Sequence, residues 1–249
     1  MESLPPLLLI DKPKGMSSFS VIRQLRRLTG VRKMGHAGTL DPLATGLMLI
    51  GVEKGTKLLT GLVGLDKEYV ATIMLGEQRS TSDMEGKVLQ EKEYAGDVTE
   101  KNILTALSSL TGEIELPVSA YSAIKIAGVP MYKRARKAAA KDELISEVPR
   151  RIMRVYEALL LEQMEILSNG KKRLQLSVRF KVGSGTYIRS LTEELGVRLG
   201  YPAVMSDLRR TKVGEYRIED AKQLTDFTRP DLALLSKIKA WYQKFRQTK

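Results

Sequence analysis

Side chains that could do chemistry gather in one short stretch, GHAGTLDPLATG at residues 35–46. The stretch contains His36, the only histidine of the chain, and Asp41, which is followed by Pro42. Because proline disfavours helical backbone at the residue before it, Asp41 should lie in an extended turn. Most Asp-Pro turns have a structural role. An ionised carboxylate can also act as a nucleophile or general base, and a buried one needs a cationic partner.

Residue types exclude several other chemistries. The chain has no cysteine, which rules out disulfides, thiolate catalysis and cysteine metal sites. A Ser-His-Asp triad would have to use His36. The segment GVEKGTK at residues 51–57 lacks the glycine spacing and the Gly-Lys-Ser/Thr of a phosphate loop, and no dinucleotide fingerprint follows a strand. No acidic cluster has the spacing of metal ligands, so we expect no metal site.

The charge balance is strongly basic. Lys and Arg total 41 against 29 Asp and Glu, which gives a net charge of +12 and a pI near 9.7. Such a balance favours a polyanionic partner such as RNA, because neutralised phosphates release condensed counterions. The alternative is a basic surface that binds nothing.

Length and hydropathy restrict the class of protein. A chain of 249 residues allows one large domain, or one domain with a smaller lobe, and 43% hydrophobic residues can form a core. The apolar run Leu7–Ile10 is too short for a signal peptide, and no run reaches membrane-spanning length. We therefore expect a cytoplasmic protein with no membrane partner.

Hydrophobic periodicity predicts the elements that must position Asp41 and its partners. Strands are expected at residues 7–10, 69–75 and 174–182, with Asn169-Gly170 turning a hairpin between the last of these and residues 155–167. Helices are expected from Ser17 or Ser18 to Gly30, over residues 99–112 with Thr99 as its cap, and over residues 188–199. This mixture predicts an α+β fold with a central mixed or mostly antiparallel sheet flanked by helices and loops.

One basic segment, KIAGVPMYKRARKAAAK at residues 125–141, differs from its surroundings. It has few large apolar residues and carries one tyrosine. One interpretation is a solvated helix or flexible loop, and the other is a mobile arm that becomes ordered on a polyanion. The residues alone do not choose between them.

Five stretches together resemble a known family. The stretch GHAGTLDPLATG, followed by GVEKGTKLL, resembles the central motif of the bacterial tRNA pseudouridine-55 synthases, the TruB family. Four others match in order: LLLIDKPKGMSS near the N-terminus, KEYVATIMLGEQRSTSDMEG at 67–86, PVSAYSAIKIAGVPMYKRAR at 117–136, and GSGTYIRSLTEELG at 183–196, with SDLRR at 206–210. The resemblance runs from about residue 7 to about residue 224.

The resemblance implies a fold and a reaction. The fold would be that of pseudouridine synthases, with an RNA-binding insertion, and the enzyme would isomerise the uridine at position 55 in the T-arm loop of tRNA. The reaction breaks the N-glycosidic bond and rejoins the same base through carbon. It uses no cofactor and no metal, and it requires a nucleophile and a pocket for a flipped base.

The same resemblance assigns the catalytic residues. Asp41 would be the nucleophile, attacking either the sugar C1′ or the base. Arg189 would pair with Asp41 and keep it ionised in a low-dielectric pocket. Tyr69 would pack on the target base and assist removal of its C5 proton.

Four more residues match substrate-binding positions. Tyr187 and Leu208 would form the wall of the uracil pocket. His36 would contact or displace the flipped nucleotide, although it could instead be a structural histidine. Lys12, with Pro13, matches a motif that supports the active-site loop, and for it we favour scaffolding over direct contact.

The resemblance also divides the chain. Residues 1–226 would form the catalytic domain, in which about residues 120–150 are a mobile basic RNA-binding insertion. Its cations would contact the RNA backbone: Lys125, Lys133, Arg134, Arg136 and Lys137. Residues 227–249 would form a short C-terminal helical extension where many relatives have a PUA domain, either because this is a compact form without that domain or because the sequence is truncated. Ala37 also departs from the polar residue common there, and we expect an RNA-acting monomer.

Two other functions remain open from the sequence. The chain could be an RNA-binding or RNA-remodelling protein, since charge and the basic segment suit that role equally well. It could also be a pseudouridine synthase that acts on a ribosomal or messenger RNA. The combination of Asp41, Tyr69 and Arg189 favours catalysis, because binding alone needs no buried acid.

Overall fold

The computed structural model describes residues 4–122, 124–141, 143, 145 and 148–227, which fall into two compact units. The first unit contains residues 4–63 and 216–227, and the second contains residues 64–215. The C-terminal helix predicted for residues 227–249 lies outside the described residues, apart from its first position.

A small antiparallel sheet and helix α1 (Ser18–Thr29) organise the first unit. Strand β3 (Thr45–Val52) pairs with both β1 (Leu7–Lys12) and β2 (Met34–Ala37), and it is buried over almost its whole length because it is apolar throughout. The remaining elements are short: the 3-10 turns η1 (Glu53–Leu58), η2 (Ile218–Asp220) and η3 (Leu224–Asp226), helix α2 (Leu59–Val63) and strand β13 (Tyr216–Arg217).

Helix α1 begins and ends as its sequence predicts. The Ser17 hydroxyl accepts a hydrogen bond from the Ser20 amide at 3.1 Å, which satisfies one of the free donors of the first turn. Gly30 ends the helix with φ of +75°, a left-handed conformation that favours glycine.

A five-stranded antiparallel sheet forms the body of the second unit, in the order β12–β4–β11–β10–β7. The strands are β4 (Lys67–Leu75), β7 (Gly112–Pro117), β10 (Arg150–Ser168), β11 (Lys171–Val182) and β12 (Ala203–Val213). Asn169 and Gly170 form the predicted two-residue hairpin between β10 and β11, with φ of +52° and +75°. Left-handed backbone at both positions suits the twist of the flanking strands.

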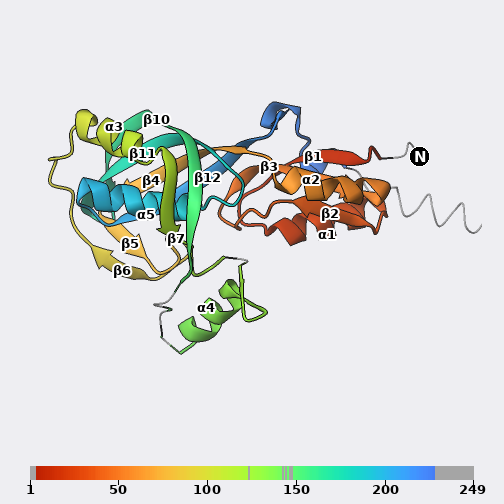
Figure 1. Cartoon of the computed structure of the whole chain (residues 1–249), viewed down its shortest axis with the longest axis horizontal. Coiled ribbons are helices and arrows are strands. Elements are labelled where there is room, and N and C mark those ends of the chain that lie inside the picture. The colour runs from red at the N-terminus through yellow and green to blue at the C-terminus, as the bar shows by residue number, and fades with distance from the viewer. Residues whose placement is uncertain (1–3, 123, 142, 144, 146–147, 228–249) are drawn as a thin grey trace, which may run out of the picture. The chain divides into compact units, whose positions relative to one another are not determined.

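Helices α3 (Glu100–Ser109) and α5 (Ile188–Leu199) pack on this sheet and on each other (Figure 1). Thr99 caps α3 as predicted and forms a reciprocal capping box with Asn102. The helix ends at Ser109, earlier than the predicted residue 112, because Gly112 adopts φ of +97° and starts β7 opposite Val155. The predicted α+β class with a mostly antiparallel sheet is confirmed.

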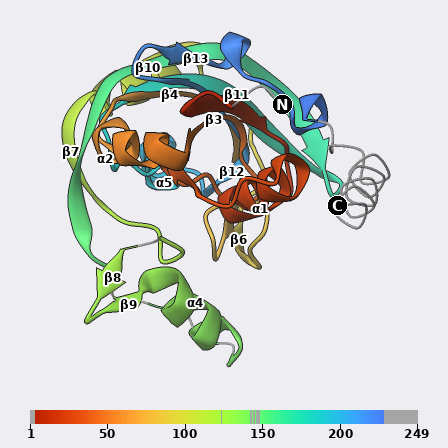
Figure 2. The same cartoon turned by 90° about the vertical axis from the view of Figure 1, so that its right-hand side faces the viewer.

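Two β-hairpins complete the second unit. Strands β5 (Glu77–Arg79) and β6 (Val88–Glu91) form one, and β8 (Lys125–Ile126) and β9 (Val129–Pro130) form the other. The chain then enters α4 (Met131–Ala139), and Figure 2 shows β8, β9 and α4 together. The basic segment is therefore a hairpin and a short helix.

Candidate active site

The predicted site residues divide between the two units. Lys12, His36 and Asp41 belong to the first unit. The second unit contains the other predicted side chains: Tyr69, Lys125, Lys133, Arg134, Arg136, Lys137, Tyr187, Arg189 and Leu208.

In the first unit, Lys12 holds the loop that carries Asp41. The Lys12 side chain is 0% exposed, and its Nζ donates to the carbonyls of Pro13 (3.0 Å), Met16 (2.6 Å) and Pro42 (3.2 Å). Because one buried ammonium has three donors, it satisfies carbonyls from two separate loops at once. The structure thus places the Lys12 ammonium against the carbonyl of Pro42, the residue that follows Asp41.

The other side of the Asp41 loop is held by Ser18 at the start of α1. Its hydroxyl accepts from the Leu40 amide at 2.8 Å and donates to the Leu40 carbonyl at 3.0 Å. The Asp41 carbonyl in turn accepts from the Ala44 amide at 3.1 Å. Backbone on both sides of Asp41 is therefore fixed, while its side chain is only half-buried. Such a loop can present a carboxylate with little reorganisation.

His36 lies on β2, the strand that leads into this loop. It pairs in register with Ile50 of β3 and is half-buried. His36 and Asp41 thus come from one continuous piece of backbone that spans β2 and the following loop.

In the second unit, Tyr69 and Leu208 share one face of the sheet. Tyr69 lies opposite Phe180 on β11 and Arg210 on β12, and Leu208 lies opposite Ala71. Residues directly opposite each other, and residues two apart, point to the same face of a sheet. Both side chains are buried, at 8% and 6% exposed.

Tyr187 and Arg189 start helix α5. Tyr187 is its extended N-cap residue and is half-buried. Arg189 is 6% exposed, and its guanidinium donates to the carbonyls of Thr81 (3.1 Å) and Tyr121 (3.4 Å). Arg189 therefore connects the helix to two loops, the second of which leads into the basic segment.

A carboxylate that the sequence interpretation missed accompanies Arg189. Asp83 lies 3.7 Å from the Arg189 guanidinium and is almost completely buried. Its Oδ1 accepts from the Thr81 hydroxyl (2.5 Å) and the Glu85 amide (3.1 Å), so the turn itself aims the charge. The only local signal is a run of small polar residues, Ser80 to Asp83, which is typical of any turn.

Lys67, two residues before Tyr69, is another buried cation of this unit. Its Nζ donates to the Leu65 carbonyl at 2.5 Å and to the Ser184 hydroxyl at 3.4 Å. Burial, reinforced by the Arg210 guanidinium and opposed by Asp66, lowers the pKa of Lys67 from 10.5 to about 8. Lys67 thus titrates within reach of physiological pH.

The basic segment exposes most of its predicted cations. Lys125, Lys133 and Arg136 are exposed, and the Arg136 guanidinium lies 5.7 Å from the centre of the Tyr132 ring. Arg134 is half-buried and donates to the Ile126 carbonyl at 2.9 Å, so it also joins α4 to the β8–β9 hairpin.

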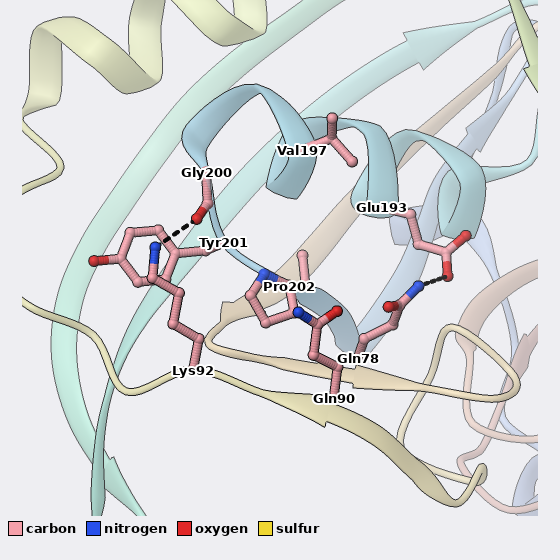
Figure 3. A pocket seen from close by; sticks show the side chains of 9 residues that line it. Gln78, Gln90, Lys92, Glu193, Val197, Gly200, Tyr201 and Pro202 are labelled. Atoms are coloured by element: carbon pink, nitrogen blue, oxygen red, sulfur yellow. Dashed lines mark hydrogen bonds between the residues drawn. The ribbon is translucent and has the colours of Figure 1, made fainter.

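A pocket with mixed polar and apolar lining in the second unit includes Glu193 and Val197 of α5 and Gly200, which follows that helix (Figure 3). Gln78, Gln90, Lys92 and Glu193 contribute polar groups, and Lys92 donates to the Gly200 carbonyl at 2.8 Å. None of the predicted site residues lines it. Its volume of about 260 Å³ falls below the roughly 300–1,000 Å³ of typical ligand sites.

The described residues contain neither a metal-binding cluster nor a membrane-spanning helix. No cluster of three or more His, Asp or Glu side chains there could hold a metal ion. Nor is any helix in that part of the chain both long and apolar enough to cross a bilayer.

Two family models match consecutive parts of the chain. The model described as TruB family pseudouridylate synthase, N-terminal domain, matches residues 26–188. The model described as tRNA pseudouridylate synthase B C-terminal domain matches residues 189–235.

Curated proteins named tRNA pseudouridine synthase B are similar over most of their length. The chain is 45% identical to that of Leifsonia xyli subsp. xyli, over 88% of this chain and 70% of the relative. It is 43% identical to that of Corynebacterium efficiens, over 88% and 71%. For Mycobacterium tuberculosis the identity is 41%, over 92% and 74%.

Solved structures are similar over nearly the same part of this chain. A chain of an H/ACA RNP bound to a substrate RNA containing 2′-deoxyuridine is 28% identical with a TM-score of 0.60, over 88% of this chain. A chain of the archaeal box H/ACA sRNP Nop10-Cbf5 complex is 28% identical with a TM-score of 0.59, over 89% of this chain. The present chain spans about half the length of each, 51% and 52%.

Proposed function

The chain belongs to the TruB family of pseudouridylate synthases, and from this premise we propose that it isomerises a uridine of tRNA to pseudouridine. The target is position 55 in the T-arm loop, and the enzyme acts as a monomer. The names of the curated relatives, tRNA pseudouridine synthase B, support the tRNA substrate. The observation that carries the proposal is the carboxylate of Asp41 on a loop held by Lys12 and Ser18.

The chemistry is an exchange of one bond for another within a single nucleotide. The bond between N1 of uracil and C1′ of the sugar breaks, and a bond between C5 and C1′ forms. C5 loses its proton and N1 gains one, so the reaction needs no outside reactant. Asp41 is the nucleophile, and it attacks either C1′ or the base.

Arg189 is the proposed cationic partner of Asp41. A guanidinium beside a carboxylate favours its charged form, which is the nucleophilic one. Within the second unit, the Asp83 carboxylate lies beside the Arg189 guanidinium, so Arg189 is oriented before the substrate binds. Asp83 is thus a positioning residue that acts through Arg189.

The remaining site residues receive the flipped base. Tyr69 packs on the uracil and assists removal of the C5 proton, and Leu208, on the same sheet face, supports the ring. Tyr187 closes the pocket wall. His36 contacts the flipped nucleotide or helps to displace it.

The basic segment binds the RNA backbone. Exposed Lys125, Lys133 and Arg136 contribute affinity that depends on salt and not on base identity. Arg134, which already donates to Ile126, contributes by holding α4 in place and by its charge.

The decisive experiment measures tritium release from C5-labelled uridine in a T-arm transcript. Wild-type protein should release the label, and Asp41→Asn should release none above background. Asp220→Asn, an exposed carboxylate of the same unit, is the matched control and should match wild type. Full turnover by Asp41→Asn would contradict the assigned role of the carboxylate.

A second target class is favoured by the 28% identity to a chain in an H/ACA RNP bound to substrate RNA. In that alternative the same chemistry occurs on a ribosomal or messenger uridine. Mapping pseudouridines in total RNA, with and without the chain, separates the two. If the T-arm transcript binds tightly and no pseudouridine forms in any RNA, the chain is a binding or remodelling protein.

A further inference from the structure

The segment from residue 12 to residue 40 has an unusual charge composition. It contains seven cations and no Asp or Glu, so it carries +7 of the net +12 within 29 residues. The cations are Lys12, Lys14, Arg23, Arg26, Arg27, Arg32 and Lys33. Lys12 is buried against three carbonyls, and Arg26 donates to the Met34 carbonyl at 2.9 Å. The five others are exposed.

The geometry of α1 arranges part of this charge as a stripe. Phe19, Arg23 and Arg27 are four residues apart, so they lie about 6 Å apart along one side of the helix. The buried residues of α1, including Val21 and Leu25, occupy the opposite side. Arg32 and Lys33, which are also exposed, follow shortly after the end of the helix.

Phe19 places an exposed aromatic ring among these cations. It is 55% exposed, while Val21, Ile22 and Leu25 of the same helix are buried. The Arg23 guanidinium lies 5.5 Å from the centre of the Phe19 ring, close enough for a cation–π contact. An exposed ring flanked by cations is the usual platform for a stacked base of single-stranded RNA.

Among the described residues, several cations elsewhere in the chain are paired with carboxylates, and those of this stripe are not. On α5, Arg198 forms an ion pair with Glu194 at 2.8 Å, and on β11 both Arg179 and Lys181 pair with Glu157. Within the described part of the chain, no ion pair involves Arg23, Arg27, Arg32 or Lys33. Solubility alone does not require positive charges to be gathered in one place without negative charges among them.

The stripe also has a fixed relation to the Asp41 loop inside the first unit. Ser18, the residue before Phe19, bonds to both backbone groups of Leu40, the residue before Asp41. At the other end, Lys33 directly precedes β2, which carries His36. A strand of RNA lying on α1 would therefore be continuous with a nucleotide presented to that loop.

We infer that Phe19, Arg23, Arg27, Arg32 and Lys33 bind single-stranded RNA next to the target nucleotide. Phe19 stacks on one base, and the cations contact the phosphates around it. The inference rests on the proposed function for its substrate, and it adds a binding surface separate from the basic segment of the second unit.

Charge and stacking give different signatures, so two variants test the surface. Binding of the full chain to a fluorescent T-arm stem-loop is measured from about 50 to 200 mM salt. In Arg23→Gln/Arg27→Gln, the slope of log affinity against log salt should fall by about 1.4, since each single-strand phosphate contact contributes about 0.7. In Phe19→Ala, affinity should fall about tenfold with the slope unchanged, because a stacking contact releases no counterions.

Controls make either result decisive. Lys101→Gln/Arg217→Gln removes two exposed cations from other elements and should leave the slope unchanged. A blunt RNA duplex without a loop should bind Phe19→Ala and wild type equally. An unchanged slope in Arg23→Gln/Arg27→Gln, or equal loss with the control pair, would overturn the inference. Equal loss of duplex and stem-loop binding in Phe19→Ala would overturn the stacking assignment.

This test is independent of turnover. A chain that loses slope as expected but releases no tritium would retain the surface and refute the proposed reaction. A chain that isomerises uridine with an unchanged slope in the double variant would retain the reaction and refute the surface.

Discussion

Lys12 of the first unit and Arg189 of the second are both buried cations among the predicted site residues, and their contacts differ. Lys12 in the first unit donates to three carbonyls, which are neutral dipoles belonging to the loops that it joins. Arg189 in the second unit donates to two carbonyls and also lies 3.7 Å from the Asp83 carboxylate. The three Lys12 bonds fix the path of the backbone, and the Asp83 contact of Arg189 brings two charges together.

This difference predicts different consequences of mutation. Removing the Lys12 ammonium leaves buried carbonyls without donors, so the cost should appear mainly in stability. Removing the charge beside Arg189 leaves the local packing intact, so the cost should appear mainly in catalysis.

Lys12→Met should lower the free energy of unfolding by about 4 kcal/mol. The carbonyls of Pro13 and Met16 would each lose a buried donor, at about 1–3 kcal/mol apiece, and Pro42 would retain only the Gly15 amide. Urea unfolding followed by circular dichroism measures the change. Lys54→Met, an exposed site of the same unit, should change stability by less than about 0.5 kcal/mol. Equal stability of the two variants would remove the structural role of Lys12.

Asp83→Asn should lower kcat/KM by about 100-fold with little loss of stability. The amide retains an oxygen that can accept from the Thr81 hydroxyl and the Glu85 amide, but the charge near Arg189 is lost. A misplacement of about 1 Å in a reacting group costs about this much. Tritium release gives kcat/KM, and Glu100→Gln on α3 serves as the neutral comparison. A loss of stability as large as that of Lys12→Met would end the contrast between the two cations.

Lys67 provides a pH test of the second unit. The pKa of about 8 in the folded chain lies below the ordinary 10.5, so the unfolded chain binds this proton more strongly. Stability therefore rises with pH between about 8 and 10.5, and the penalty is complete below about 8. Between pH 7.5 and 9.5, wild type should gain about 2 kcal/mol relative to Lys67→Met, as measured by urea unfolding. Lys101→Met should show the same pH dependence of stability as wild type. If Lys67→Met also showed it, the Lys67 ammonium would be solvated in the folded chain and its pKa would not be lowered.

Local signals explain which elements could be predicted from the sequence. The Asn169-Gly170 hairpin, the Ser17 and Thr99 caps and the glycine ends of α1 and α5 were predictable because each depends on a few neighbouring residues. Strand β3 was not predicted, because TGLMLIGV is apolar after its first residue. It therefore shows neither the alternation of a half-buried strand nor the 3.6-residue repeat of a helix. Strand β12 was not predicted either. Two bulges interrupt its alternation of apolar and polar residues, and Arg210 is a charged residue that is fully buried.

Only those residues of the candidate site that stand in recognisable motifs could be predicted from the sequence. Asp41, Tyr69 and Arg189 stand in stretches that resemble a known family, so resemblance located them. The contact between Asp83 and Arg189 spans 106 residues, from 83 to 189, and no periodicity reports such a pairing. The bonds of Lys12 end on carbonyls, which every residue possesses, so no residue type marks them.

Two buried serines give the smallest test of the same contrast. Ser18 bonds to both the amide and the carbonyl of Leu40, whereas Ser190 donates once, to the Pro117 carbonyl at 2.7 Å. Ser18→Ala leaves two buried backbone groups without this partner, and Ser190→Ala leaves one, so we expect stability losses of about 2 and about 1 kcal/mol. Because Leu40 precedes Asp41, Ser18→Ala should also slow tritium release more than its stability loss explains. Equal losses of stability and rate in the two variants would mean that α1 does not determine where the Asp41 carboxylate stands.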